Sequence, residues 1–174
     1  RFRGYRYHAA VEVADGVSVT FYDAGHVLGS ATPLLEMREN GASVRLAYAV
    51  DLGRKRIPIL RDPERPPDID YLVIESTYGG RTHASMEEAE EILARTVRAT
   101  VERGGKIIIP SFALERTQEV VYFLSKLITQ NRIPDIPIFV DSPLAVDITE
   151  VFRRHEECFD EEMIRRLRAN DDPF

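Results

Sequence analysis

The chain has 174 residues, 44% of them hydrophobic and 30% charged, and a formal net charge of −6. This hydrophobic content can build a sizeable core and argues against a disordered chain, and no apolar run approaches the roughly 20 residues of a membrane span. The acidic balance argues against a general nucleic-acid coat protein, which would be basic, and the single cysteine, Cys158, excludes an internal disulfide and predicts a reducing, cytoplasmic location.

The first half of the chain has the pattern of strands and hairpins. Alternating or continuous apolar residues predict strands over residues 17–22, 33–37, 43–50 and 71–74. Asn40-Gly41, between the second and third of these strands, is a strong hairpin signal. The continuous apolar run of residues 71–74 predicts a strand buried on both faces. Four prolines between residues 58 and 70 exclude regular structure there.

The second half of the chain alternates helix and strand. Ser85-Met86-Glu87-Glu88 is a capping box that begins a predicted helix, and Gly104-Gly105 ends it. Pro110-Ser111 leads into a second helix, and Ser142-Pro143 begins a third, with serine as N-cap and proline at the first position. The predicted strands between the helices are residues 106–109 and 138–141. This alternation implies right-handed crossovers and a parallel sheet.

The two patterns meet near residues 78–82, so we expect an α/β protein in two parts, residues 1–80 and 81–174. The chain does not begin with Met, and its first strand arrives without a preceding element, so we expect it to be part of a longer protein. Sheet faces that lack their partner strands would be apolar and bare. We therefore expect either self-association, as a homodimer, or disorder in residues 1–16.

Three polar side chains follow predicted strands at tight turns. They are His26, within the glycine-rich segment Asp23–Ala31, Asp51, and Glu75 at the end of the strand over residues 71–74. Imidazole is the commonest metal ligand, and a buried carboxylate requires a cation or a hydrogen-bond donor. Each residue alone also has an ordinary explanation: a histidine bonded inside a glycine turn, an aspartate that caps a loop, and a glutamate in a salt bridge with Arg81.

Together the three side chains point to one site, because groups at the carboxyl ends of neighbouring strands meet at one edge of an α/β sheet. The four histidines are at least 18 positions apart, so no HxH or HExxH pair occurs. A catalytic zinc needs about three protein ligands and an open position. The spacing by itself therefore indicates a candidate metal site and nothing more specific.

Five segments of the chain resemble the β-CASP branch of the metallo-β-lactamase superfamily. They are Asp23–Ala31, Asp51–Arg54, Glu75–Arg81 with His83, Pro110–Ala113 with Arg116–Glu119, and Asp141–Ala145. They follow the order of the family's motifs and cover most of the chain from residue 17 onward. The Glu-Ser-Thr-Tyr-Gly sequence at residues 75–79 is similar to the RNA-processing branch of the family.

The resemblance implies a fold, a cofactor and roles for the three site residues. Residues 1–80 would be part of a metallo-β-lactamase αββα sandwich, and residues 81–174 the first part of a β-CASP domain with a parallel sheet and flanking helices. Two zinc ions are implied in the cleft between the domains. His26 matches the third metal motif and Asp51 the fourth, whose carboxylate bridges both metals. Glu75, the second implied catalytic residue beside Asp51, would support and orient the site, where a metal-bound hydroxide attacks a phosphodiester.

The resemblance also places Ser111, Arg116 and Ser142 along the path of an RNA substrate. Helix capping by the two serines and a surface ion pair of Arg116 are the alternatives for these residues. The family's leading HxHxDH motif and the later histidine motifs of its β-CASP half are absent from the 174 residues. We therefore expect this chain alone to bind zinc weakly and to be inactive.

The sequence favours part of a zinc-dependent ribonuclease, a hydrolase that cleaves RNA as in mRNA 3′-end processing. Endonuclease and 5′-exonuclease activity both stay open. The alternatives are a metal-free β-CASP scaffold subunit of an RNA-processing complex and a DNA-processing β-CASP nuclease. A small-molecule hydrolase of the lactamase type is disfavoured, because such enzymes lack the helix–strand half at residues 83–174.

Overall fold

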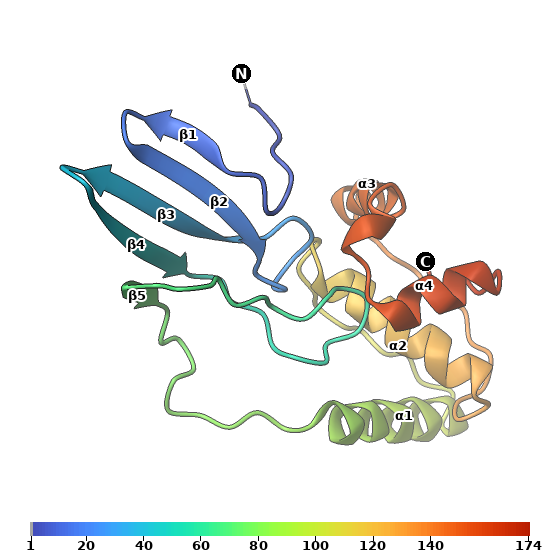
Figure 1. Cartoon of the computed structure of the whole chain (residues 1–174). Coiled ribbons are helices and arrows are strands. Elements are labelled where there is room, and N and C mark those ends of the chain that lie inside the picture. Colours follow the sequence, from blue (N-terminus) through green and yellow to red (C-terminus); the bar gives the residue numbers. More distant parts are fainter. Residues whose placement is uncertain (1) are drawn as a thin grey trace. The chain divides into compact units, whose positions relative to one another are not determined.

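The computed structural model describes residues 2–174 and divides into two compact units. The first unit comprises the residues up to Arg56 together with Leu60–Arg81, and the second comprises Ile57–Ile59 together with Thr82–Phe174. Strands make up the first unit and helices the second (Figure 1). The predicted α/β class is therefore confirmed, whereas the assignment of residues 1–80 and 81–174 to two family domains stays a prediction.

The first unit is built on one five-stranded sheet whose strands lie in chain order. The strands are β1 (Val11–Ala14), β2 (Val17–Asp23), β3 (Ala31–Glu39), β4 (Ala42–Ala49) and β5 (Tyr71–Ile74). The first four strands pair antiparallel, and β5 pairs parallel to β4. A parallel pair requires a long connection, and residues 50–70 supply it without a helix or a strand. For residues 58–70 this confirms the prediction from the four prolines.

The hairpin between β3 and β4 turns where the sequence predicted it. Asn40 has φ 49° and Gly41 has φ 80°, and Glu39 pairs with Ala42 across the turn. Two consecutive positive φ values are the signature of a type I′ turn, which suits the twist of the two strands. By contrast, β1 was not predicted. Its pairing with β2 contradicts the alternative of disorder for Val11–Ala14, and the alternative of self-association stays a prediction.

The prediction that β5 is buried on both faces is wrong. Tyr71 is 61% exposed, Leu72 50% and Ile74 54%. Among the described residues β5 is the edge of the sheet, with β4 as its one neighbour. The described part of the first unit also contains no helix that could cover either face of this strand. An apolar run therefore identified the strand correctly but did not reveal its surroundings.

The second unit contains four α-helices and one short 3₁₀ helix. They are α1 (Met86–Glu102), α2 (Arg116–Thr129), α3 (Pro143–Phe152), η1 (Glu156–Cys158) and α4 (Glu161–Arg168). Ser85 caps α1 by accepting a hydrogen bond from the Glu88 backbone N–H at 3.1 Å, as the capping box predicted. The Gly105 N–H donates to Thr100 O at 2.9 Å and ends the helix in the predicted place.

Apolar packing and ion pairs hold the helices of the second unit together. One buried cluster consists of Ala94, Val97, Leu124, Leu127 and Ile133. A second buried group contains Phe152 and Phe159, whose ring centroids lie 6.5 Å apart. Glu90 of α1 forms ion pairs with Lys126 of α2, at 2.9 Å, and with Arg132. The apolar contacts and the Glu90–Lys126 ion pair hold α1 and α2 together.

The predicted strands over residues 106–109 and 138–141 do not form. Neither segment is a strand, and Ile108 is 89% exposed and Phe139 85% exposed. A strand exists only where a neighbour pairs with its backbone N–H and C=O groups. Within residues 2–174 every strand pairing belongs to β1–β5, so these apolar segments have no such neighbour.

Candidate functional site

The loop that carries His26 follows β2 and is organised by short-range hydrogen bonds. Asp23 Oδ1 accepts from the Gly25 N–H at 2.8 Å, and Ser30 Oγ accepts from the N–H groups of His26 at 3.0 Å and Val27 at 3.2 Å. Burial raises the pKa of the Asp23 carboxyl above its usual range. The His26 side chain itself is exposed, so the loop presents the imidazole to solvent.

The turn that carries Asp51 lies directly against this loop. Asp51 has φ 50°, a left-handed conformation that aspartate tolerates. The Gly53 N–H donates to Ala24 O at 2.8 Å, and a Cβ at position 53 would lie 1.7 Å from Gly25 O. Only glycine allows so close an approach. The sequence therefore brings the His26 loop and the Asp51 turn into contact.

Glu75 joins the same cluster from the end of β5. Its Oε1 accepts from the Leu52 N–H at 2.7 Å, and its Oε2 accepts from the Thr77 hydroxyl at 2.7 Å. These two donors, and to a smaller extent the nearby His26 imidazole, lower the pKa of the Glu75 carboxyl. The salt bridge with Arg81 considered from the sequence does not occur among the described residues. Glu75 is thus an ionised carboxylate that fixes the Asp51 turn.

The sequence patterns did not indicate a second group of residues, which form hydrogen bonds with the two ends of the His26 loop. Glu64 Oε2 lies 2.8 Å from Nε2 of His8 and accepts from the Asp23 N–H at 3.0 Å. The Tyr7 hydroxyl donates to Ser30 O at 2.8 Å. Both ends of the loop are therefore tied to residues far away in the sequence. No local motif links positions 7, 8 and 64, so only the fold reveals this support.

Ser111, Arg116 and Ser142 all belong to the second unit. Ser142 caps α3 by accepting from the Ala145 N–H at 3.2 Å, and Arg116 forms an ion pair with Glu119 at 2.7 Å, which are the alternatives considered from the sequence. Ser111 is exposed and does not cap α2, because that helix begins only at Arg116. Their contact with RNA stays a prediction.

The described residues do not complete a metal site. His26 and Asp51 supply an imidazole and a carboxylate, both exposed, from adjoining loops. Within residues 2–174, no group of three or more His, Cys, Asp or Glu side chains is placed so that it could hold a metal ion. Two ligands are fewer than a catalytic zinc requires. The donors present fit part of a zinc centre.

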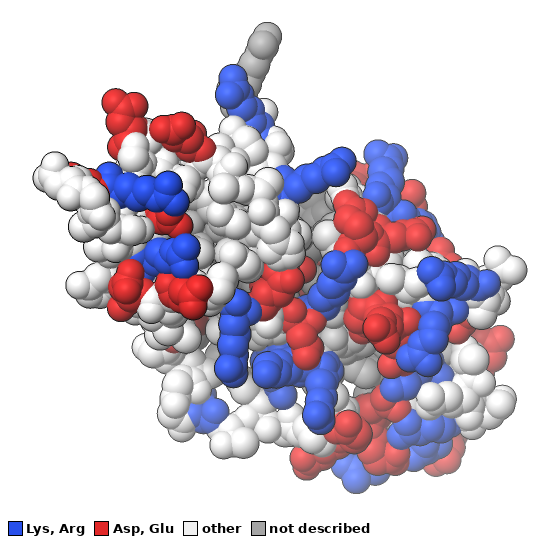
Figure 2. Space-filling model, in the orientation of Figure 1, with Lys and Arg blue, Asp and Glu red and all other residues white. Residues whose placement is uncertain are grey.

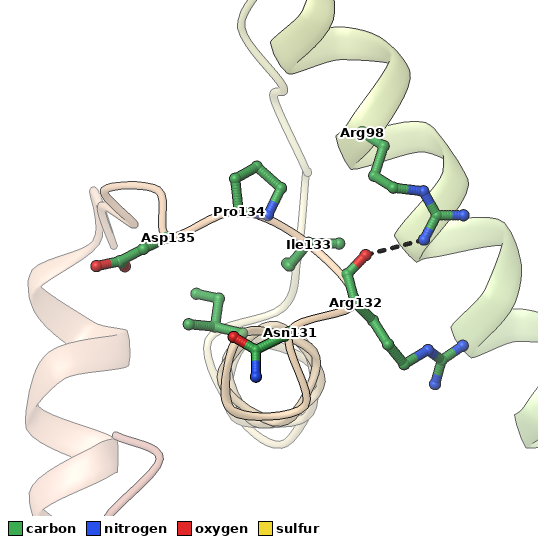
Figure 3. A pocket seen from close by; sticks show the side chains of 7 residues that line it. Arg98, Asn131, Arg132, Ile133, Pro134 and Asp135 are labelled. Carbon is green, nitrogen blue, oxygen red and sulfur yellow. Dashed lines mark hydrogen bonds between the residues drawn. The ribbon is translucent and has the colours of Figure 1, made fainter.

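A pocket of about 370 Å³ in the second unit lies among residues that the sequence did not single out. It is lined by Arg98, Ile128, Asn131, Arg132, Ile133, Pro134 and Asp135 (Figure 3). The Arg98 guanidinium donates to Arg132 O at 2.9 Å, and both arginines form ion pairs with Glu91. Their charges are used within the fold, so the pocket offers little to an anionic ligand.

In the described part of the chain no helix combines the length and the apolarity that a bilayer span requires.

The strand-rich first unit and the helical second unit define an α/β protein. His26, Asp51 and Glu75, which meet in the first unit, are residue types found in hydrolytic metal sites. Residues 117–174 match the family model of the Beta-Casp domain. For these residues the match confirms the resemblance to the β-CASP family that the motifs predicted.

Relatives along most of the chain support the same family. The chain is 35% identical over 158 residues to ribonuclease TTHA0252 of Thermus thermophilus, 38% over 152 residues to cleavage and polyadenylation specificity factor subunit 3 of Dictyostelium discoideum, and 32% over 176 residues to endoribonuclease ysh1 of Schizosaccharomyces pombe. These alignments cover 91%, 86% and 100% of this chain but 35%, 19% and 22% of the relatives. The chain thus spans about a third or less of their length.

Proposed function

We propose that this chain supplies part of the active site of a zinc-dependent ribonuclease, an enzyme that hydrolyses RNA phosphodiester bonds, and that its residues belong to a longer polypeptide. The proposal depends on one observation, the meeting of the His26 loop, the Asp51 turn and the Glu75 carboxylate through the hydrogen bonds of Gly53 and Leu52. The relatives named as ribonucleases support RNA as the substrate.

In this proposal His26 and Asp51 are metal ligands, and the remaining ligands lie outside the described residues. Glu75 acts on Asp51 through the Leu52 N–H, because the hydrogen bond of 2.7 Å to the ionised carboxylate holds the turn in its left-handed conformation. Such charge-assisted bonds are stronger than neutral ones.

The second unit would contribute the RNA contacts that the family resemblance implies. Ser111 is exposed and could bond a phosphate directly, whereas Arg116 would exchange Glu119 for the substrate. Ser142 would keep its capping bond to α3 while its unit lines the RNA path. The cytoplasmic location and the homodimer expected from the sequence likewise stay predictions.

The test measures RNA cleavage and zinc content together in the longer protein that contains this chain. The wild-type protein should cleave a labelled RNA and retain zinc after dialysis, and Asp51→Ala should abolish cleavage and lower the zinc content. Asp147→Ala, which removes an exposed carboxylate of α3, is the matched control and should change neither.

The alternatives give different results in the same experiment. Cleavage of DNA but not of RNA would assign the protein to the DNA-processing branch of the family. A folded protein with neither cleavage nor zinc would support the metal-free scaffold subunit. Cleavage and zinc content that are unchanged in Asp51→Ala would refute the proposal that Asp51 is part of the active site.

A further inference from the structure

The chain leaves the candidate site after Gly53 and returns to it at Glu64. The Gly53 N–H donates to Ala24 O at 2.8 Å, and the Glu64 N–H donates to Asp23 O at 2.9 Å. Both ends of the segment between positions 53 and 64 are therefore fixed to consecutive residues at the base of the His26 loop. A loop whose ends lie close together is a common carrier of function. We call residues 54–65 the basic loop.

The basic loop is positively charged within an acidic chain. It contains five Arg or Lys residues and two acidic residues, Asp62 and Glu64, which gives a formal charge of +3 against −6 for the whole chain. The cationic residues are Arg54, Lys55, Arg56, Arg61 and Arg65, and all five are exposed. Figure 2 shows acidic and basic side chains interspersed over one face of the molecule.

The acidic groups of the basic loop are used to shape it. Asp62 Oδ1 accepts from the Arg56 N–H at 2.6 Å, and Glu64 bonds to His8 and to the Asp23 N–H. Arg61 lies near enough to Asp23 and Glu64 to interact with both carboxylates. The loop's own carboxylates therefore do not neutralise all of its cations.

Three cations of the basic loop have no carboxylate partner. Among residues 2–174, Lys55, Arg56 and Arg65 form no side-chain ion pair. Seven arginines outside the basic loop do pair with carboxylates. These are Arg38, Arg45, Arg98, Arg116, Arg132, Arg153 and Arg166. Lys55, Arg56 and Arg65 are therefore available to an external anion.

We propose that Lys55, Arg56 and Arg65 bind the phosphate backbone of RNA beside the His26 loop and the Asp51 turn. This inference rests on the proposed function, which supplies RNA as the polyanion. The basic loop begins three residues after Asp51, so bound phosphates lie next to the candidate site. Arg and Lys contacts to phosphates position a nucleic acid without reading its sequence, and they make affinity fall with salt.

The test measures binding of a fluorescein-labelled single-stranded oligouridylate to the full chain by anisotropy over a range of salt concentrations. Replacing Lys55, Arg56 and Arg65 together with glutamine should weaken binding at least about tenfold at low salt. It should also reduce the slope of log K against log salt by about 2, since each phosphate contact with a single strand contributes about 0.7. Circular dichroism and thermal melting check that the variant folds.

The matched control removes the same number of charges at exposed positions outside the basic loop. It is the triple variant Arg95→Gln, Arg154→Gln and Arg168→Gln, which should keep binding within about threefold and leave the salt slope unchanged. Equal weakening by both triple variants would show a general charge effect and overturn the proposal. No measurable binding by the unaltered chain would also overturn it.

The outcome of this experiment is independent of the test of the proposed function, because RNA binding requires neither zinc nor cleavage. RNA binding through the basic loop in a protein that cleaves nothing would uphold this inference and reject the ribonuclease. RNA cleavage that depends on Asp51 but not on the cations of the basic loop would reject this inference and uphold the ribonuclease.

Discussion

Replacing Glu64 with alanine tests whether distant residues support the His26 loop. The change removes the contact of Oε2 with His8 at 2.8 Å and the hydrogen bond from the Asp23 N–H at 3.0 Å. The backbone bond from the Glu64 N–H to Asp23 O, at 2.9 Å, does not depend on the side chain and should persist. The substitution therefore removes the side-chain support and leaves the backbone connection.

The expected loss of stability is about 1.5 kcal/mol at neutral pH. The charged hydrogen bond to the Asp23 N–H contributes about 1 kcal/mol. The His8–Glu64 ion pair adds about 0.5 kcal/mol, because its side chains are 57% and 39% exposed and are therefore screened by water. Chemical denaturation measures the loss, and Glu12→Ala, an exposed position of β1, is the control.

The loss should also depend on pH. Burial works to raise the pKa of Glu64, but the Asp23 N–H and His8 outweigh it and the pKa is lowered from 4.5. A carboxyl whose pKa is lower in the folded state contributes stability above its unfolded pKa, and loses it as the pH falls through the folded value. The difference between wild type and Glu64→Ala should therefore shrink as the pH falls below about 4.5.

Hydrogen exchange locates the effect in the structure. The amide of Gly25, which donates to Asp23, should exchange faster in Glu64→Ala than in wild type, while the amides of α1 should not change. The reasoning is refuted if Glu64→Ala is as stable as Glu12→Ala at pH 7, or if the amides of the His26 loop keep their protection.

Two further predictions concern a close backbone contact and an ion pair. Gly53→Ala should cost about 3 kcal/mol, since its Cβ would lie 1.7 Å from Gly25 O, whereas Gly80→Ala, with no atom within 4 Å, should be near neutral; equal thermal midpoints would contradict this. Arg166 lowers the pKa of the Asp171 carboxyl, so Asp171→Asn should destabilise the chain at pH 7. The loss should be about 1 kcal/mol or less, because the Asp171 side chain is 35% exposed. The difference should vanish as the pH falls through the lowered pKa, and a difference that persists in urea titrations at acid pH would refute the prediction.

Features set by neighbouring residues could be predicted from the sequence. The turn at Asn40-Gly41 and the cap at Ser85 each depend on conformations and hydrogen bonds within a few residues. The same is true of the turn residues around His26 and Asp51, so the loops of the candidate site were found. The strand β1 carried a usable signal as well, since its apolar residues precede Asp15-Gly16, a hairpin dipeptide.

Features that depend on distant partners could not be predicted in the same way. Residues 106–109 have a strand pattern, but a strand also needs a paired neighbour, and none lies alongside them within residues 2–174. The contact of Glu64 with His8 joins positions 56 apart and follows from no spacing rule. Burial of β5 failed for the same reason, since an apolar run does not specify what covers it.

The participation of Ile57–Ile59 in the second unit has a consequence for how the protein can be divided. Ile59 is fully buried there, and its carbonyl accepts from the Asp160 N–H at 2.8 Å at the start of α4. A recombinant piece that begins at Thr82 would lack this side chain and this acceptor. Expressed alone, it would contain an empty space where Ile59 packs and an unsatisfied donor at Asp160, so the two units are better produced as one polypeptide.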